Sequence, residues 1–169
     1  MRVVSAILGA ATVTATGLCG AMPIAAASDY GFEINGTYSF LSNGEWAKSN
    51  QIFHDEPVVR ATWQVSSTCT STAKCTGQVT SDQGWTAPLK FTVDRWIVLR
   101  DIPNWAPCED GTAATGHQMF LFYGTNDDGQ NTRGTDLMSG RDITKTDSGS
   151  CGRNQGLVLE IPMRLTRIS

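Results

Sequence analysis

Histidine and charged residues are scarce in this sequence of 169 residues. It has two histidines, and 17% of its residues are charged, with a formal net charge of −3. Nucleic-acid binding calls for a basic surface and docking on anionic lipid calls for clustered lysine and arginine, so the acidic balance disfavours both. With only two histidines, an imidazole-based catalytic centre is less easily formed, which disfavours an enzyme.

Recognisable catalytic motifs are lacking as well. The G-x-S-x-G elbow of α/β-hydrolases is absent. Ser148, in an Asp-Ser-Gly segment, follows His54 in the chain order of chymotrypsin-like proteases, but the second glycine of that motif is missing. Glu45, Glu56 and Glu109 could supply a glycosidase-like carboxylate pair. We predict no catalytic residue and expect Ser148 in a polar loop, with an exported hydrolase built on loop Ser/His or carboxylate groups as an alternative.

Metal-binding patterns are missing too. Only Cys69 and Cys75 lie close together in sequence, which does not match the paired spacing of zinc sites. The acidic segment 126–131 departs from the EF-hand spacing and lacks its final glutamate. His117 opens an apolar segment and is typical of a strand end. We therefore predict no metal and no cofactor.

The first 27 residues have the pattern of a cleaved signal peptide. Arg2 provides a positive start, residues 3–22 are apolar or small, and three alanines precede Ser28 as a cleavage site. A membrane anchor is the alternative, and Leu18 before Cys19 disagrees with a lipoprotein signal. We expect residues 1–27 to be removed and residues 28–169 to form one domain, secreted or held in the cell envelope without stable membrane insertion.

Four cysteines remain once Cys19 is removed. An even number in an exported chain predicts two disulfides, for which three pairings exist. Cys69 and Cys75 flank a short polar segment between two expected strands, where a hairpin brings the Cα atoms within disulfide range. We expect Cys69 to pair with Cys75, and Cys108 to pair with Cys151.

Short strand patterns dominate the chain. Apolar residues alternate with polar ones at 59–66 and again at 157–165. Further strands are expected at 32–40, 76–80, 85–93, 96–100 and 118–123, a short helix only at 44–52, and a long loop at 101–116. The pattern predicts an all-β fold: a single disulfide-braced antiparallel β-barrel of about eight strands, with a sandwich as the alternative. Pro162 cannot donate to a ladder and marks an edge or a bulge.

Aromatic residues gather in one stretch of the chain. All five tryptophans lie between positions 46 and 105, and residues 119–123 are apolar on both faces of their strand. Trp63 belongs to the apolar face of its strand and is expected in the core. Trp105 is expected in a stiff loop, as a plug over one barrel end or part of a binding surface. Five residues are candidates for contact with a ligand or partner: Trp85, Trp96, Trp105, Phe120 and Phe122.

Six dispersed motifs carry a resemblance. They are Gly36-Thr-Tyr38, Gly44-Glu-Trp-Ala47, Cys75-Thr-Gly77, Thr80-Ser-Asp-Gln-Gly-Trp-Thr-Ala-Pro88, Pro103-Asn-Trp-Ala-Pro-Cys108 and Cys151-Gly-Arg-Asn154. On these motifs the chain resembles small secreted mycobacterial proteins of uncharacterised function, over nearly all of residues 28–169. A fainter resemblance is to lipocalin-type barrels, with Gly36-x-Tyr38 on the first strand and Arg164 or Arg167 near the last. Neither resemblance transfers a catalytic residue.

Together these observations favour a secreted β-barrel binding module. We expect it to carry a small apolar ligand or lipid, or to dock on a partner in the cell envelope. The aromatic excess and the missing catalytic constellation motivate this hypothesis. An exported hydrolase and an interaction protein with a filled, ligand-free core are the alternatives.

Overall fold

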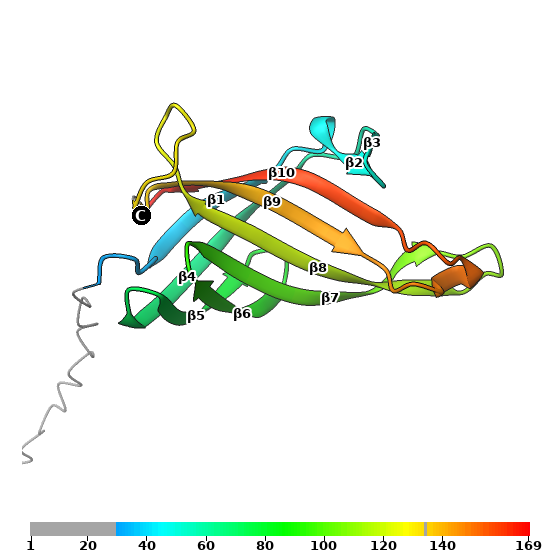
Figure 1. Cartoon of the computed structure of the whole chain (residues 1–169), viewed down its shortest axis with the longest axis horizontal. Helices are drawn as coiled ribbons and strands as arrows, with labels where there is room; N and C mark the ends of the chain where they lie inside the picture. Colours follow the sequence, from blue (N-terminus) through cyan, green and yellow to red (C-terminus); the bar gives the residue numbers. More distant parts are fainter. Residues whose placement is uncertain (1–29, 134) are drawn as a thin grey trace, which may run out of the picture.

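The computed structural model describes residues 30–133 and 135–169 (Figure 1). Its elements, in chain order, are β1 (Gly36–Ser42), η1 (Gly44–Trp46), β2 (Lys48–Ser49), β3 (Ile52–Phe53), β4 (Val59–Ser71), β5 (Lys74–Ser81), β6 (Trp85–Thr92), β7 (Arg95–Pro107), β8 (Ala113–Gly124), β9 (Leu137–Lys145), η2 (Ser150–Gly152) and β10 (Val158–Arg167). The predicted signal peptide, its cleavage site and Cys19 lie outside the described residues.

Eight strands close into an antiparallel barrel. Their order is β1-β4-β5-β6-β7-β8-β9-β10, and β10 pairs back onto β1. Strands that follow one another along the barrel are antiparallel neighbours, as short connections require. The small β2–β3 hairpin pairs with β10 beyond the end of β1. The predicted barrel is confirmed, and the closing β1–β10 ladder excludes the sandwich.

Pro162 lies within β10 without breaking the closure. On one side it stands opposite Arg141 of β9. On the other side the β1 ladder begins at Met163 and the β2 ladder ends at Glu160, so Pro162 falls in the gap between them. Its missing N–H is not needed there, while its carbonyl accepts a hydrogen bond from the Asn43 N–H at 2.9 Å.

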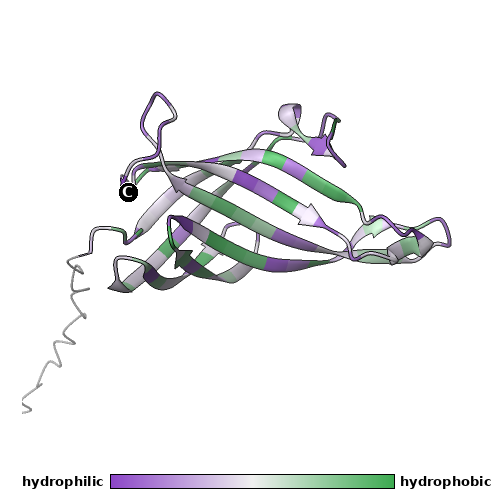
Figure 2. Cartoon of the chain, in the orientation of Figure 1, coloured by the Kyte–Doolittle hydropathy of each residue, from purple (hydrophilic) through white to green (hydrophobic). Residues whose placement is uncertain are grey.

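Period-two alternation sends one set of side chains into the barrel. In β4 the residues Ala61, Trp63 and Val65 are buried, and in β10 the same holds for Ile161, Met163 and Leu165. The alternation is visible along the strands in Figure 2. Both inward faces are those that the sequence predicts.

The sequence patterns predict no strand at 137–145, where β9 lies, because polar residues interrupt the apolar alternation there. Two other differences concern boundaries. β7 runs to Pro107 and β8 starts at Ala113, so most of the predicted 101–116 loop is a long hairpin, and Trp105 lies in a strand. Prolines normally signal a loop, but the β7–β8 register shifts between Ile102 and Ala106, and this irregularity accommodates Pro103. The predicted 44–52 helix is only the three-residue η1, after which the chain turns into β2.

Both predicted disulfides are present, one toward each end of the barrel. Cys69 and Cys75 are directly opposed on β4 and β5, with Cα atoms 3.9 Å apart. Cys108 follows β7 and Cys151 lies in η2, so their disulfide joins the β7–β8 hairpin to the β9–β10 connection. The second link closes a far longer segment, with a sequence separation of 43 against 6.

Stacked aromatic rings fill the middle of the barrel. Phe40 and Trp63 stack with centroids 4.4 Å apart, and Phe120 packs edge-on against both. Trp63 and Phe122 are fully buried. The barrel is therefore packed with aromatic rings at its centre.

Candidate functional site

Two cavities lie at opposite ends of the barrel. The Arg100 cavity, about 260 Å³, lies at the end that carries the β5–β6 turn; its walls include Phe40, Trp85, Arg100, Trp105, Gln118, Phe120 and Asp142. The Trp96 cavity, about 290 Å³, lies at the end that carries the β6–β7 turn; its walls include Phe32, Ile34, Phe91, Asp94, Trp96, Tyr123 and Arg133.

A chain of polar side chains crosses the interior beside the Arg100 cavity. Arg100 on β7 and Gln118 on β8 stand opposite each other, and the Arg100 Nε–H donates to Gln118 Oε1 at 2.5 Å. Gln118 Nε2 donates to Asp142 Oδ1 at 2.7 Å, and Ser42 Oγ donates to Asp142 Oδ2 at 3.0 Å. Four strands (β7, β8, β9 and β1) thus hold one connected network, which fixes each side chain in place.

The Arg100 guanidinium also lies over an aromatic wall. Its central carbon is 4.4 Å from the Trp85 ring centroid, within the range of a cation–π contact. Trp85 in turn stacks on Phe120 with centroids 5.8 Å apart and nearly parallel planes. Arg100 is therefore held from two directions, by an amide and by a ring.

Burial shapes the charges in this cavity. Desolvation raises the pKa of Asp142 above its ordinary value, while the donors Gln118 and Ser42 and the charge of Arg100 oppose the shift. Desolvation also lowers the pKa of Arg100, opposed by the charge of Asp142. An arginine keeps its proton at neutral pH even so. The cavity wall thus carries a permanent, half-buried positive charge.

Hydrogen-bond donors exceed acceptors here. The indole Nε1–H of Trp85, which lines the cavity, is buried without a hydrogen-bond partner among the described residues. The Nε1–H of Trp63, in the adjoining core, also lacks one there. Beyond its bond to Gln118, Arg100 makes no ion pair within 4.0 Å in the described part of the chain. A buried donor without an acceptor costs free energy, so such groups call for an ordered water or a ligand.

At the rim of the Arg100 cavity, the carboxylate of Glu56 faces a histidine. Glu56 lines the cavity, and its Oε1 lies 3.1 Å from His54 Nδ1. The rim therefore adds negative charge next to the opening.

Within the residues that the structure describes, Ser148, His54 and Glu109 contact partners other than those a hydrolase site needs. The Ser148 hydroxyl donates to the carbonyl of Asn154 at 2.6 Å, and His54 contacts Glu56 instead. Glu109 pairs with Arg153 at 2.6 Å. Ser148 lies in the connection after β9, in agreement with the polar loop residue expected from the sequence.

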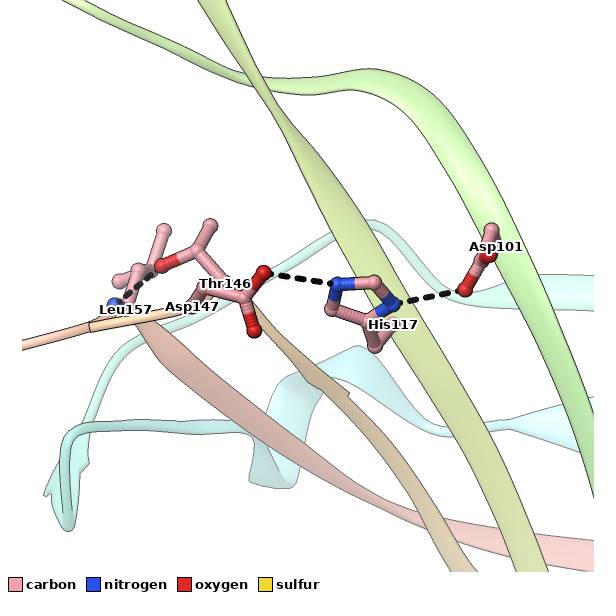
Figure 3. A network of polar contacts seen from close by, with 5 residues as sticks. All are labelled: Asp101, His117, Thr146, Asp147 and Leu157. Atoms are coloured by element: carbon pink, nitrogen blue, oxygen red, sulfur yellow. Dashed lines mark hydrogen bonds and ion pairs between the residues drawn. The ribbon is translucent and has the colours of Figure 1, made fainter. Parts of the chain in front are cut away.

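His117 forms the other polar cluster, on the outside of the barrel (Figure 3). Its Nδ1 lies 2.7 Å from Asp101 on β7, and its Nε2 lies 3.3 Å from Asp147 after β9. Two hydrogen bonds raise the pKa of His117, and the one to Asp101 has a larger effect than the one to Asp147. The cluster links neighbouring strands and contains no nucleophile, so it is a surface ion-pair group.

An apolar stripe also lies on the outer surface. Phe120 and Phe122 point inward, which leaves Met119 and Leu121 on the outside of β8. Leu99 stands opposite Met119 and is 55% exposed. These residues explain why residues 119–123 are apolar on both faces of their strand. The stripe is apolar throughout, and this property does not specify a particular partner.

Four of the five aromatic candidates line one of the two cavities, and the fifth belongs to the core. Trp85, Trp105 and Phe120 line the Arg100 cavity, Trp96 lines the Trp96 cavity, and Phe122 is buried in the core. Sequence reasoning missed Arg100, Gln118 and Asp142. The period-two alternation of β7 could have indicated Arg100. It lies two and four residues after Val98 and Trp96, so its side chain shares their inward face.

Two further searches of the described residues gave negative results. Within residues 30–133 and 135–169, no group of three or more His, Cys, Asp or Glu side chains is arranged to hold a metal ion. No helix in the same ranges is long and apolar enough to cross a membrane.

Comparison with known proteins yields a likeness of fold. The sequence matches no family model and no curated protein. Among solved structures, the chain is similar to the sensor domain of PknI from M. tuberculosis in its monomer form, with a TM-score of 0.59 and 15% identity over 81% of this chain and 88% of that one. This mycobacterial neighbour supports the barrel fold, whereas the lipocalin likeness stays an observation on sequence motifs.

Proposed function

We propose that this protein is a binding module of the cell exterior or envelope that takes a small molecule into the Arg100 cavity. The single observation that carries the proposal is the network from Arg100 through Gln118 and Asp142 to Ser42, buried beside an aromatic-walled cavity. Buried charges cost free energy, and a well-formed pocket with a few convergent polar groups is the usual form of a ligand site.

The compartment and the fold support the same function. Two disulfides are typical of proteins outside the cytoplasm. The structural neighbour is described as a sensor domain, which fits a binding role for this barrel. We retain the cleaved segment 1–27 and the single domain 28–169 as part of the proposal.

The size of the cavity limits the ligand. A cavity of about 150 Å³ holds benzene, so about 260 Å³ holds a ring with a small substituent and is too small for a whole lipid. We therefore propose a small molecule with a polar group, in place of the apolar ligand or lipid expected from the sequence.

A binding screen on the purified, oxidised protein tests the proposal. We expect at least one small anionic, neutral or cationic ring compound to raise the melting temperature and change tryptophan fluorescence. The Val59→Phe variant, which fills the cavity wall, should abolish that response. If no compound of any charge binds to the wild-type protein, the proposed function is wrong.

A further inference from the structure

We infer that the ligand of the Arg100 cavity is a small planar monocarboxylate, an aromatic acid of about the size of benzoate. The inference rests on the proposed function and adds the chemical class of the ligand. It is carried by the unequal use of donors and acceptors in the cavity, the shape of its aromatic walls, and the charge at its rim.

The cation of the cavity is open, whereas its carboxyl group is occupied. Both oxygens of Asp142 already accept hydrogen bonds, one from Gln118 and one from Ser42. Arg100 uses its Nε–H on Gln118, and the described residues offer no ion pair to its two terminal amino groups. A guanidinium binds a carboxylate through two parallel hydrogen bonds, which is the geometry these amino groups allow.

A second donor needs an acceptor in the same wall. Trp85 lines the cavity, and its buried Nε1–H has no partner among the described residues. An indole N–H donates only, whereas a carboxylate offers about four acceptor sites and no donor. A carboxylate therefore matches the unmet demand, and an amine or ammonium group does not.

The walls favour a flat ring. Trp85 stacks on Phe120 with nearly parallel planes, which presents a flat aromatic surface beneath Arg100. Trp105, on the same strand β7 as Arg100, packs against Gly116 of β8, where a Cβ atom would lie 2.7 Å from the indole. Glycine at this position therefore lets the Trp105 ring pack directly on β8. Aromatic rings prefer such offset-stacked or edge-on neighbours.

The rim favours a single negative charge. Glu56 lines the opening and Asp142 lies at the inner wall, so a dianion would meet carboxyl groups on two sides. A monocarboxylate places its one charged group on Arg100 and leaves no second charge to face these carboxyl groups. The ligand class is therefore a monocarboxylate rather than a dicarboxylate or a phosphate.

A matched set of probes tests the class by isothermal titration calorimetry and tryptophan fluorescence. The probes are benzoate, its neutral isostere benzamide, the cation benzylammonium and the dianion phthalate. We expect benzoate to bind about 10- to 100-fold tighter than benzamide, because a charge-assisted bidentate pair is lost in the amide. Benzylammonium and phthalate should bind more weakly than benzoate.

Three variants assign the effect to Arg100. Arg100→Gln should weaken benzoate binding to the level of benzamide, and Arg100→Lys should keep part of the preference. Arg141→Gln is the matched control, since Arg141 lies next to Asp142 on β9 but is exposed and pairs with Glu160 on the outer surface. If Arg100→Gln fails to fold, Trp85→Phe gives a second test. It removes the unpartnered N–H and one ring of the indole but keeps an aromatic wall, and it should still weaken benzoate more than benzamide.

The outcomes distinguish failure of the monocarboxylate assignment from failure of the proposed binding function. If benzamide or benzylammonium binds as tightly as benzoate, or if Arg100→Gln leaves benzoate binding unchanged, the monocarboxylate assignment is wrong and the proposed binding function stands. If a crystal structure soaked with benzoate shows only ordered water on Arg100 and Trp85, the assignment is also wrong. If none of the probes and no compound of the wider screen binds, the proposed function itself fails.

Discussion

The two ends of the barrel hold cavities of similar volume but opposite chemistry. At the Arg100 cavity the charged groups face inward and are held by hydrogen bonds across four strands. At the Trp96 cavity the charges sit on the rim, where Arg133 lies 5.2 Å from the Phe32 ring and Asp94 pairs with its neighbour Arg95. Exposed ion pairs contribute little, whereas buried charge is costly and is kept where specificity needs it.

Cavity volume alone does not identify the binding site. The Trp96 cavity, although slightly larger, is bounded by an N-terminal segment and the β8–β9 loop, and its Phe32, Phe91 and Trp96 rings pack as part of the core. Buried polar atoms without a partner among the described residues occur toward both ends, as Tyr38 Oη and Trp85 Nε1 show. The Arg100 cavity differs in that a cation and a carboxyl group face inward and are joined by one hydrogen-bond network.

The largest expected difference between the ends comes from their disulfides. In the chain-entropy model, loss of Cys108–Cys151 should lower the free energy of unfolding by about 4 kcal/mol and loss of Cys69–Cys75 by about 2 kcal/mol, because the closed segments differ in length. Paired Cys→Ser variants in urea denaturation measure both values. Equal losses would show that loop length does not set the contribution of each disulfide.

Next in size is the effect of removing one carboxylate from each cavity. Asp142→Ala leaves the donors of Gln118 and Ser42 without acceptors and should lower the free energy of unfolding by about 2 kcal/mol. Asp94→Ala removes an exposed group paired with Arg95 and should have no measurable effect. Thermal and urea unfolding check both. An Asp142→Ala protein as stable as wild type would argue against an ordered internal network.

The smallest effect is a difference in titration. Burial raises the pKa of Asp142, while the hydrogen bond from Arg95 lowers the pKa of Asp94. Carbon-13 NMR of the carboxyl groups should therefore place Asp142 above the ordinary value of 3.8 and Asp94 below it.

The sign of the stability effect is opposite for the two groups. Stability contributed by Asp142 is present below its unfolded pKa and is lost as the pH rises through its raised folded pKa. Stability contributed by Asp94 is present above its unfolded pKa and is lost as the pH falls through its lowered folded pKa. Asp142→Asn should thus gain stability relative to wild type as the pH rises from 3 to 7. If both carboxyl groups titrate at one pH, the contrast between buried and rim charge is wrong.

Much of the barrel follows from local sequence. Alternation in β4 and β10 gives the inward faces, and the hairpin around Cys69 and Cys75 gives one disulfide. The β7–β8 hairpin differs from the prediction because prolines are typical of loops. In the structure Pro103 lies within a register shift, and Pro107 is the last residue of β7. Local patterns cannot reveal such a shift, since it depends on the partner strand.

The candidate site was only partly within reach of the sequence. Trp85, Trp105 and Phe120 were named because aromatic residues are easily recognised. Arg100, Gln118 and Asp142 come from three strands, and only barrel closure and register bring them together beside Ser42. The alternation of β7 alone predicts that the Arg100 side chain points inward, but it does not predict which side chain Arg100 contacts.

The most direct test of the account is a benzoate titration followed through the tryptophan indole signals in proton–nitrogen NMR. Trp85 and Trp105 line the Arg100 cavity, and Trp96 lines the other one. The account predicts that the Nε1–H signals of Trp85 and Trp105 shift in a saturable way, while the Trp96 signal stays in place. A saturable shift of Trp96 with Trp85 and Trp105 unmoved would contradict it.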